Sequence, residues 1–252
     1  MLEASLYDQN SFLTLTYSGE HLPPGGALVK KHFQDFMKRL RKRFSDQKIR
    51  YYMCGEYGDE PMREFVTELG RPHFHACVFN FDFPDKKFSG YSKAGEKMYA
   101  SETLDRVWGK GRCWIGDVTF ESAAYTARYM LKKVNGDDSE EHYTRVDKST
   151  GEVHVVPKEF ATQSRRPGIG KPWLDLWKED IYPSDFVVIR GRRCTPPKYF
   201  DEIVKLDDPE MIEALKEQRV ARAKERRAKE TGQRLWDQET VKLAQADMLK
   251  RE

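Results

Sequence analysis

Apolar and polar positions along the first 200 residues change period several times, and each period predicts an element. Phe12–Tyr17 (FLTLTY) is a compact run of β-forming residues followed by a turn-rich segment, which predicts a strand. From Leu28 to Phe44 apolar residues recur every three or four positions among lysines and arginines, which predicts a helix with one buried stripe. By the same criteria we expect strands at 49–56, 73–79 and 114–120, helices at 101–108 and 122–134, and a hairpin formed by 144–146 and 153–156.

The last part of the chain has a different composition. Residues 201–252 contain 12 basic and 13 acidic residues, no cysteine, and only Pro209 and Gly232 as helix breakers. We therefore expect an α+β domain over residues 1–200 and a charged helical tail over 201–252. The basic segment 221–230 (ARAKERRAKE) is able to touch DNA phosphates, but its interleaved acids favour a solvated helix.

Composition and charge limit the class of protein. The 252-residue chain has a net charge of +3, which is too small to indicate a general nucleic-acid binder. No apolar run approaches the roughly 20 residues that cross a bilayer, so we expect a soluble cytoplasmic protein with no membrane partner. The four cysteines lack CxxC spacing, which predicts reduced thiols. There is no GxxxxGK[ST] motif, so the sequence does not support a fused helicase or ATPase.

A His-hydrophobic-His pattern marks one of the expected strands. Alternation along a strand places His73 and His75 on the same face, roughly 7 Å apart, so that both imidazoles can converge on one ion. Glu56, at the end of the preceding strand, is able to add a carboxylate if the two strands pair. Exposed histidines without a ligand are the alternative. Zinc, with Cys77 as a further ligand, is a less favoured alternative because a cysteine-rich set is lacking.

The expected helix 122–134 carries two tyrosines and a lysine on one face. A helical wheel places Tyr129 about 40° and Lys132 about 20° from Tyr125. The wheel places the apolar residues on the opposite arc, namely Ala123, Ala127, Met130, Leu131 and Val134. A phenol has a pKa near 10 and needs activation to attack phosphorus, and a divalent metal that polarises a phosphodiester makes such an attack feasible. Two phenols on one face permit a second attack before the first covalent end is released.

Taken together, these motifs resemble the HUH endonuclease superfamily, and within it the rolling-circle replication initiators of microviruses of the gokushovirus type. The resemblance covers about residues 10 to 175. The stretches that carry it are FLTLTY (12–17), CGEYGDE (54–60), GRPHFHACVF (70–79), AYTARYMLKK (124–133) and SRRPGIGKPW (164–173). It implies a central antiparallel sheet of about five strands with helices packed on it, in an RRM-like topology.

The resemblance also implies roles for single residues. It implies His73, His75 and Glu56 as ligands of Mg²⁺ or Mn²⁺, with Asp59 or Glu60 as substitutes for Glu56. It implies Tyr125 and Tyr129 as alternating nucleophiles and Lys132 as a helper at the phosphate. Basic side chains of the matching stretches are candidate DNA contacts, namely Arg71, Arg128, Arg165, Arg166 and Lys171.

The implied activity is that of a metal-dependent, site-specific single-stranded DNA endonuclease and strand transferase. It would nick the plus-strand origin of circular phage DNA through a 5′-phosphotyrosyl intermediate and rejoin the displaced strand into a circle. A host helicase and a host DNA polymerase would assist it in the cytoplasm of the infected bacterium. The alternatives are a transposase or relaxase of the same superfamily, and a non-catalytic RNA- or DNA-binding domain in which Phe12, Tyr51 and Phe74 stack on bases.

Overall fold

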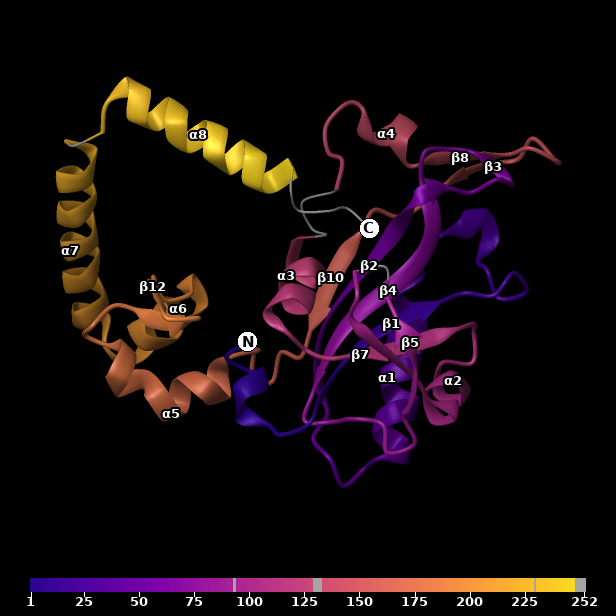
Figure 1. Cartoon of the computed structure of the whole chain (residues 1–252), viewed down its shortest axis with the longest axis horizontal. Coiled ribbons are helices and arrows are strands. Elements are labelled where there is room, and N and C mark those ends of the chain that lie inside the picture. The colour runs from indigo at the N-terminus through magenta and orange to yellow at the C-terminus, as the bar shows by residue number, and fades with distance from the viewer. Residues whose placement is uncertain (93, 129–132, 229, 248–252) are drawn as a thin grey trace. The chain divides into compact units, whose positions relative to one another are not determined.

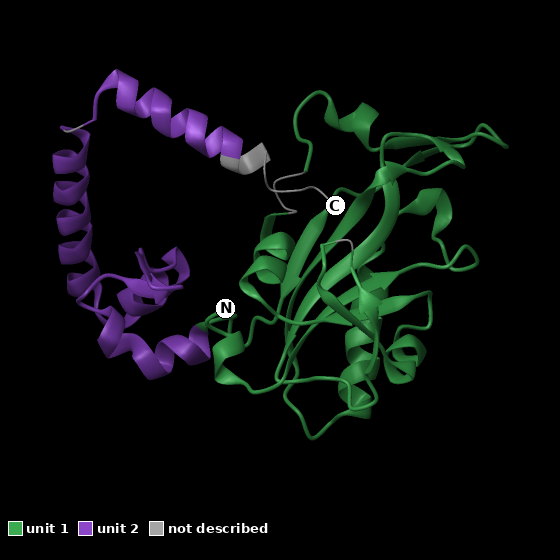
Figure 2. Cartoon of the chain, in the orientation of Figure 1, with its two compact units in different colours: residues 1–170 green, residues 171–252 purple. Residues whose placement is uncertain are grey.

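A computed structural model describes residues 1–92, 94–128, 133–228 and 230–247 of the chain (Figure 1). The chain divides into two compact units, residues 1–170 and residues 171–252 (Figure 2). This division precedes the limit that we expect at residue 200, and that limit stays a prediction. Among the described residues, no helix combines the length and the apolar character that a membrane span requires.

The centre of the first unit is a seven-stranded sheet in which every paired neighbour is antiparallel, with the order β10-β2-β4-β1-β7-β6-β5. The strands are β1 (Asn10–Thr16), β2 (Arg50–Pro61), β4 (Gly70–Phe79), β5 (Lys87–Tyr91), β6 (Lys97–Ala100), β7 (Cys113–Gly116) and β10 (Phe160–Gln163). The expected antiparallel α+β architecture is confirmed, with seven strands where the resemblance implied about five.

One face of the sheet carries the main core. α1 (Lys30–Arg43) buries Phe33, Phe36, Met37 and Leu40, the stripe that its sequence predicts. Phe33 packs on Phe74 of β4 with ring centroids 5.8 Å apart. α2 (Glu102–Trp108) begins at the N-cap Ser101, ends at the left-handed Gly109, and adds Trp108 to the same core. Each fully buried large apolar side chain contributes about 1.5–3 kcal/mol, so this face supplies most of the stability of the unit.

The opposite face of the sheet is covered by α3 (Phe120–Arg128). The backbone N–H of Ser122 donates to the hydroxyl of Thr119 and that of Thr119 donates to Ser122 Oγ, a reciprocal cap that starts the helix. The strand expected at 114–120 is therefore wrong at its C-terminal end, because β7 stops at Gly116. Thr126 is the buried residue of α3 and Ala127 is exposed, so the apolar arc of the wheel does not face the sheet.

Shorter elements complete the first unit. They are the 3₁₀ helices η1 (Ala4–Leu6) and η2 (Pro24–Gly26), the helix α4 (Ser139–His142), and the strands β3 (Phe65–Val66), β8 (Thr144–Asp147) and β9 (Val153–Val155). The expected hairpin is confirmed in β8 and β9, which pair with β3 in a second sheet. Arg145 of β8 is fully buried and donates to the carbonyl oxygens of Gly25, Gly26 and Gly70, which ties this small sheet to η2 and β4.

The second unit is mainly helical. It contains α5 (Lys171–Ile181), a hairpin of β11 (Val187–Ile189) and β12 (Arg192–Cys194), and the helices α6 (Lys198–Asp207), α7 (Pro209–Arg227) and α8 (Gly232–Asp247). The expected helical tail is thus confirmed over its described residues, although it is not solvated throughout. Its helices α6 and α7 bury four apolar residues, Phe200, Val204, Ile212 and Leu215.

Candidate metal centre and tyrosine helix

The pairing of β2 with β4 assembles a cluster of three side chains. Glu56 lies opposite His73 in the register, and Cys54 lies opposite His75. Because side chains alternate along a strand, Glu56 and both histidines project from the face that α3 covers. Nε2 of His73 lies 2.8 Å and Nε2 of His75 lies 2.9 Å from the same oxygen, Glu56 Oε1. The ligand atoms of the three residues all lie within 4.8 Å of one another, which is the spacing of a shared cation.

Neighbouring groups fix the orientation of both imidazoles. Nδ1 of His73 lies 3.0 Å from the carbonyl oxygen of Arg71, which can only accept, so this nitrogen carries a proton. Nδ1 of His75 lies 3.1 Å from Thr14 Oγ1, and the ring of Phe12 stacks on the His75 ring at 5.4 Å. With Nδ1 protonated, each neutral ring presents the lone pair of Nε2 to the cluster, as a metal ligand must.

The residues of the cluster fit a bound cation. Glu56 is 1% exposed, and its second oxygen, Oε2, is buried with no hydrogen-bond partner among the described residues. Burial raises the pKa of the Glu56 carboxyl, but the contacts with His73 and His75 outweigh burial, so that its pKa lies below the ordinary value. A carboxylate that stays ionised without full compensation is costly in a protein interior. A divalent ion held by Glu56, His73 and His75 would offset that cost.

The alternative ligands named from the sequence do not join this cluster. Burial raises the pKa of Cys77 to about 11, and its sulfur contacts Thr126 Oγ1 of α3 at 4.0 Å. Asp59 and Glu60 follow Glu56 on β2 and are exposed. Within the described residues, Glu56, His73 and His75 form the one group of metal-ligating side chains with this spacing.

α3 brings a tyrosine to the cluster. The ring of Tyr125 meets the ring of His75 edge to face, with centroids 5.1 Å apart. The helix is held against the sheet by its cap and by Thr126, one residue further on, which is fully buried and contacts Cys77. A phenol therefore stands beside the candidate cation site. The other two residues predicted on this helix face, Tyr129 and Lys132, lie outside the described residues.

The candidate DNA-contacting residues lie in several places. Arg71 precedes His73 on the same face of β4, and its Nε donates to the carbonyl oxygen of Tyr17. Arg128 ends α3 and its Nε donates to the carbonyl oxygen of Ala124. Arg165 and Arg166 are exposed in the turn after β10, and Lys171 begins the second unit, where it pairs with Asp175. Of these basic residues, Arg71 and Arg128 belong to the elements that carry the cluster and Tyr125.

The structure also shows two supporting residues that the sequence analysis did not single out for this role. Thr14 and Phe12 both lie on β1, and the register places Thr14 opposite His75. The alternation of FLTLT indicates that these side chains share a face, but their neighbour is known only once β1 is paired with β4. Phe74 is fully buried, Tyr51 packs on Phe33, and Phe12 covers His75. The aromatic residues proposed for base stacking are thus engaged in packing.

Comparison with known proteins places the chain among viral replication proteins. The sequence model of the replication-associated protein ORF2 family matches residues 10–134, which include all three residues of the cluster and both tyrosines. The chain is 32% identical to the replication-associated protein VP4 of Bdellovibrio phage phiMH2K, over 82% of this chain and 62% of the relative. It is 34% identical to the replication-associated protein ORF2 of Spiroplasma virus 4, over 85% of this chain and 64% of the relative.

A more distant relative is the replication-associated protein ORF4 of Chlamydia phage 1, which is 28% identical over 81% of this chain and 48% of the relative. The chain therefore spans less than two thirds of the length of these three relatives. No solved structure matches the chain.

Proposed function

Because the chain belongs to the replication-associated protein ORF2 family, we propose that it is a replication initiator that nicks one strand at the origin of circular phage DNA and later rejoins the displaced strand into a circle. The observation that carries this proposal is the position of Tyr125, whose ring lies 5.1 Å from that of His75 in the Glu56–His73–His75 cluster. A nucleophile beside a candidate cation site is the combination that phosphoryl transfer to a protein side chain requires.

We assign the cation as Mg²⁺ or Mn²⁺, held by Glu56, His73 and His75. When bound, the ion would neutralise charge on the scissile phosphate and make the phosphorus easier to attack. The protein itself contributes the orientation of the ligands. The Arg71 carbonyl and Thr14 hold the two imidazoles, and α3 holds Tyr125 against the same face of the sheet.

In the proposed reaction, Tyr125 Oη forms a bond to phosphorus while the bond between phosphorus and O3′ breaks. The phenolic proton passes to solvent, and the departing O3′ takes up a proton and becomes a free hydroxyl. The 5′ phosphate stays on the enzyme as a phosphotyrosine, so the phosphodiester is exchanged and not hydrolysed. Attack by a 3′ hydroxyl on the phosphotyrosine reverses these bond changes and joins two DNA ends.

The second tyrosine and the lysine enter the proposal through the sequence. Tyr129 follows Tyr125 by one helical turn and would serve the second cleavage, after the origin has been copied, while Lys132 would assist at the phosphate. We assign unwinding to a host helicase and strand extension to a host DNA polymerase, in the cytoplasm of the infected bacterium. The free 3′ hydroxyl of the nick would be the primer for that polymerase.

The test is formation of a covalent adduct. The full chain is incubated with a single-stranded origin oligonucleotide and Mn²⁺, and the products are separated on a denaturing gel. We expect a protein–DNA adduct that is lost in the Tyr125→Phe/Tyr129→Phe double variant and retained in Tyr91→Phe. Tyr91 is 62% exposed on the outermost strand β5, so Tyr91→Phe removes a phenol far along the sheet from the cluster. Undiminished nicking by the double variant would overturn the proposal.

A further inference from the structure

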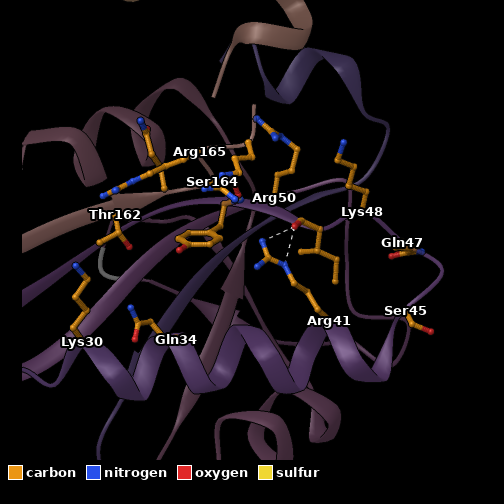
Figure 3. Close-up of a pocket in the computed structure, with 14 residues that line it drawn as sticks. Lys30, Gln34, Arg41, Ser45, Gln47, Lys48, Arg50, Thr162, Ser164 and Arg165 are labelled. Atoms are coloured by element: carbon orange, nitrogen blue, oxygen red, sulfur yellow. Dashed lines mark hydrogen bonds between the residues drawn. The ribbon is translucent and has the colours of Figure 1, made fainter. Parts of the chain in front are cut away.

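A recess of about 720 Å³ lies at the β10 edge of the sheet, between α1 and the strands β2 and β10 (Figure 3). α1 packs on the face of the sheet that carries Phe74, whereas His73 and His75 project from the other face. The recess is therefore separate from the candidate metal centre. The residues that line it are Lys30, Gln34, Arg41, Ser45, Gln47, Lys48, Ile49, Arg50, Tyr51, Thr162, Gln163, Ser164, Arg165 and Arg166.

The lining is strongly basic. Six of these residues are lysine or arginine, and none of them is acidic. The exposed cations are Lys30, Lys48, Arg165 and Arg166, for which the described residues offer no acidic partner. The whole chain has a net charge of +3, yet α1 alone carries seven basic residues and one acidic residue, Asp35. Asp35 pairs with Lys31 and Lys38 and so leaves the cations of the recess uncompensated.

The walls of the recess are fixed in position. Arg50 is buried, pairs with Glu3, and donates to the carbonyl oxygen of Gly168. Ser164 and Tyr51 exchange two hydrogen bonds, in which the Tyr51 N–H donates to Ser164 Oγ and the Ser164 N–H donates to the Tyr51 carbonyl oxygen. The turn that presents Arg165 and Arg166 is thereby attached to β2. Arg165 and Arg166 therefore project from a supported turn.

On the other wall, Arg41 donates to the carbonyl oxygen of Ile49 and lies over the ring of Tyr51 at 5.6 Å. Figure 3 shows Lys30, Gln34 and Arg41 along α1, facing Thr162, Ser164 and Arg165 across the opening. Cations on two walls of one recess repel one another, and a low-dielectric surface strengthens their field. A polyanion that enters between the walls relieves this repulsion, whereas no apolar ligand would.

Polar side chains between the cations favour a nucleic-acid strand over a simple anion. Amide and hydroxyl groups of Gln34, Thr162 and Gln163 alternate with the charges along the recess. Oε1 of Gln47 is buried with no hydrogen-bond partner among the described residues, so this amide is able to accept a bond from a ligand. A single strand exposes both its phosphates and its base edges, and a groove with charged walls follows such a strand. A duplex keeps its bases paired and would contact mainly the rim.

We propose that this α1–β10 groove binds the backbone of a single-stranded DNA segment other than the one that reaches Tyr125. The identification of the polyanion as DNA rests on the proposed function; the location and the charge of the groove do not. A groove of this kind would retain the strand that is displaced during replication while its cleaved end stays at the other face.

The test compares two double variants of equal charge. Lys30→Ala/Lys48→Ala removes two cations of the groove, and Lys87→Ala/Lys97→Ala removes two exposed lysines from β5 and β6 at the far end of the sheet. Binding of a labelled oligothymidine is measured by fluorescence anisotropy without divalent metal, between about 50 and 200 mM salt. Each phosphate contact to a single strand contributes about 0.7 to the slope of log K against log salt. We expect the slope to fall by about 1.4 in the groove variant, for two lost contacts, and to be unchanged in the control variant.

Equal slopes in wild type and groove variant would overturn the proposal, and so would an equal loss in both double variants. A duplex of the same length is the second probe, and a loss confined to the duplex would contradict the single-strand assignment. Arg165→Ala/Arg166→Ala should reproduce the loss from the opposite wall. Thermal unfolding of each variant checks that the fold is intact.

Failure of the groove and failure of the proposed function give different results. If the wild type forms the covalent adduct and the slopes are equal, the groove assignment is wrong and the function stands. If no adduct forms and the slope still falls, the groove binds DNA and the nicking activity is wrong.

Discussion

The replacement of Thr14 by valine should weaken metal binding without touching a metal ligand. The Thr14 hydroxyl lies 3.1 Å from His75 Nδ1, and it is the group that keeps the proton on that nitrogen and the lone pair on Nε2. Valine has nearly the same shape and a high preference for strands, so β1 should pair as before. The variant leaves His75 Nδ1 without this partner in a ring that is only 8% exposed.

Loss of a group that orients a metal-binding imidazole lowers metal affinity by about 10- to 100-fold. This corresponds to about 1.4–2.8 kcal/mol of binding free energy. The assay is a calorimetric titration of the metal-free protein with Mn²⁺. Thr16→Val is the matched control, since Thr16 lies two residues further on the same face and its hydroxyl donates to the Arg112 carbonyl oxygen at 2.8 Å, not to a histidine. If Thr14→Val binds Mn²⁺ as tightly as Thr16→Val does, the role given to Thr14 is refuted.

Two predictions concern stability. Phe33→Ala should lower the free energy of unfolding by about 3–5 kcal/mol in a urea titration, because Phe33 is 1% exposed and packs on Phe74; a loss below about 1 kcal/mol would contradict the packing. Hydrogen bonds from Ser149 and Thr150 lower the pKa of Asp147 to about 2 in the folded state. This carboxylate therefore stabilises the fold above the unfolded pKa of about 3.9, and the stabilisation is lost as the pH falls towards 2. The melting temperature of Asp147→Asn should show less of this loss between pH 4 and pH 2 than that of the wild type, and parallel curves would refute the assignment.

Much of the site could be predicted from the sequence because its parts are local patterns. The alternation that puts His73 and His75 on one face depends only on the strand, and the stripe of α1 depends only on the helical period. Glu56 is different, since its place opposite His73 depends on how β2 pairs with β4. The motif order indicated that pairing, and the observed register agrees with it.

Other features depend on contacts between distant segments, and for these the sequence pattern was insufficient. β5 and β6 are half-exposed and polar, and β10 is a short edge strand, so none of the three shows a clear apolar alternation. The face of α3 that meets the sheet was wrong on the wheel because Ala127 is exposed and Thr126 is buried, where it meets Cys77. The basic groove joins residues of α1 with the turn after β10, more than 100 residues later.

The central claim is that a tyrosine of the helix beside the metal cluster becomes covalently linked to DNA. Tryptic mapping by mass spectrometry tests this directly, because cleavage after Arg112, Arg128 and Lys132 puts Tyr125 and Tyr129 on separate peptides. After incubation with origin DNA and Mn²⁺ and digestion of the DNA, we expect a nucleotide attached to the peptide of residues 113–128 or to that of 129–132, and no attachment when the metal is chelated. A nucleotide on any other peptide, or a nick that leaves no nucleotide on the protein, would contradict the account.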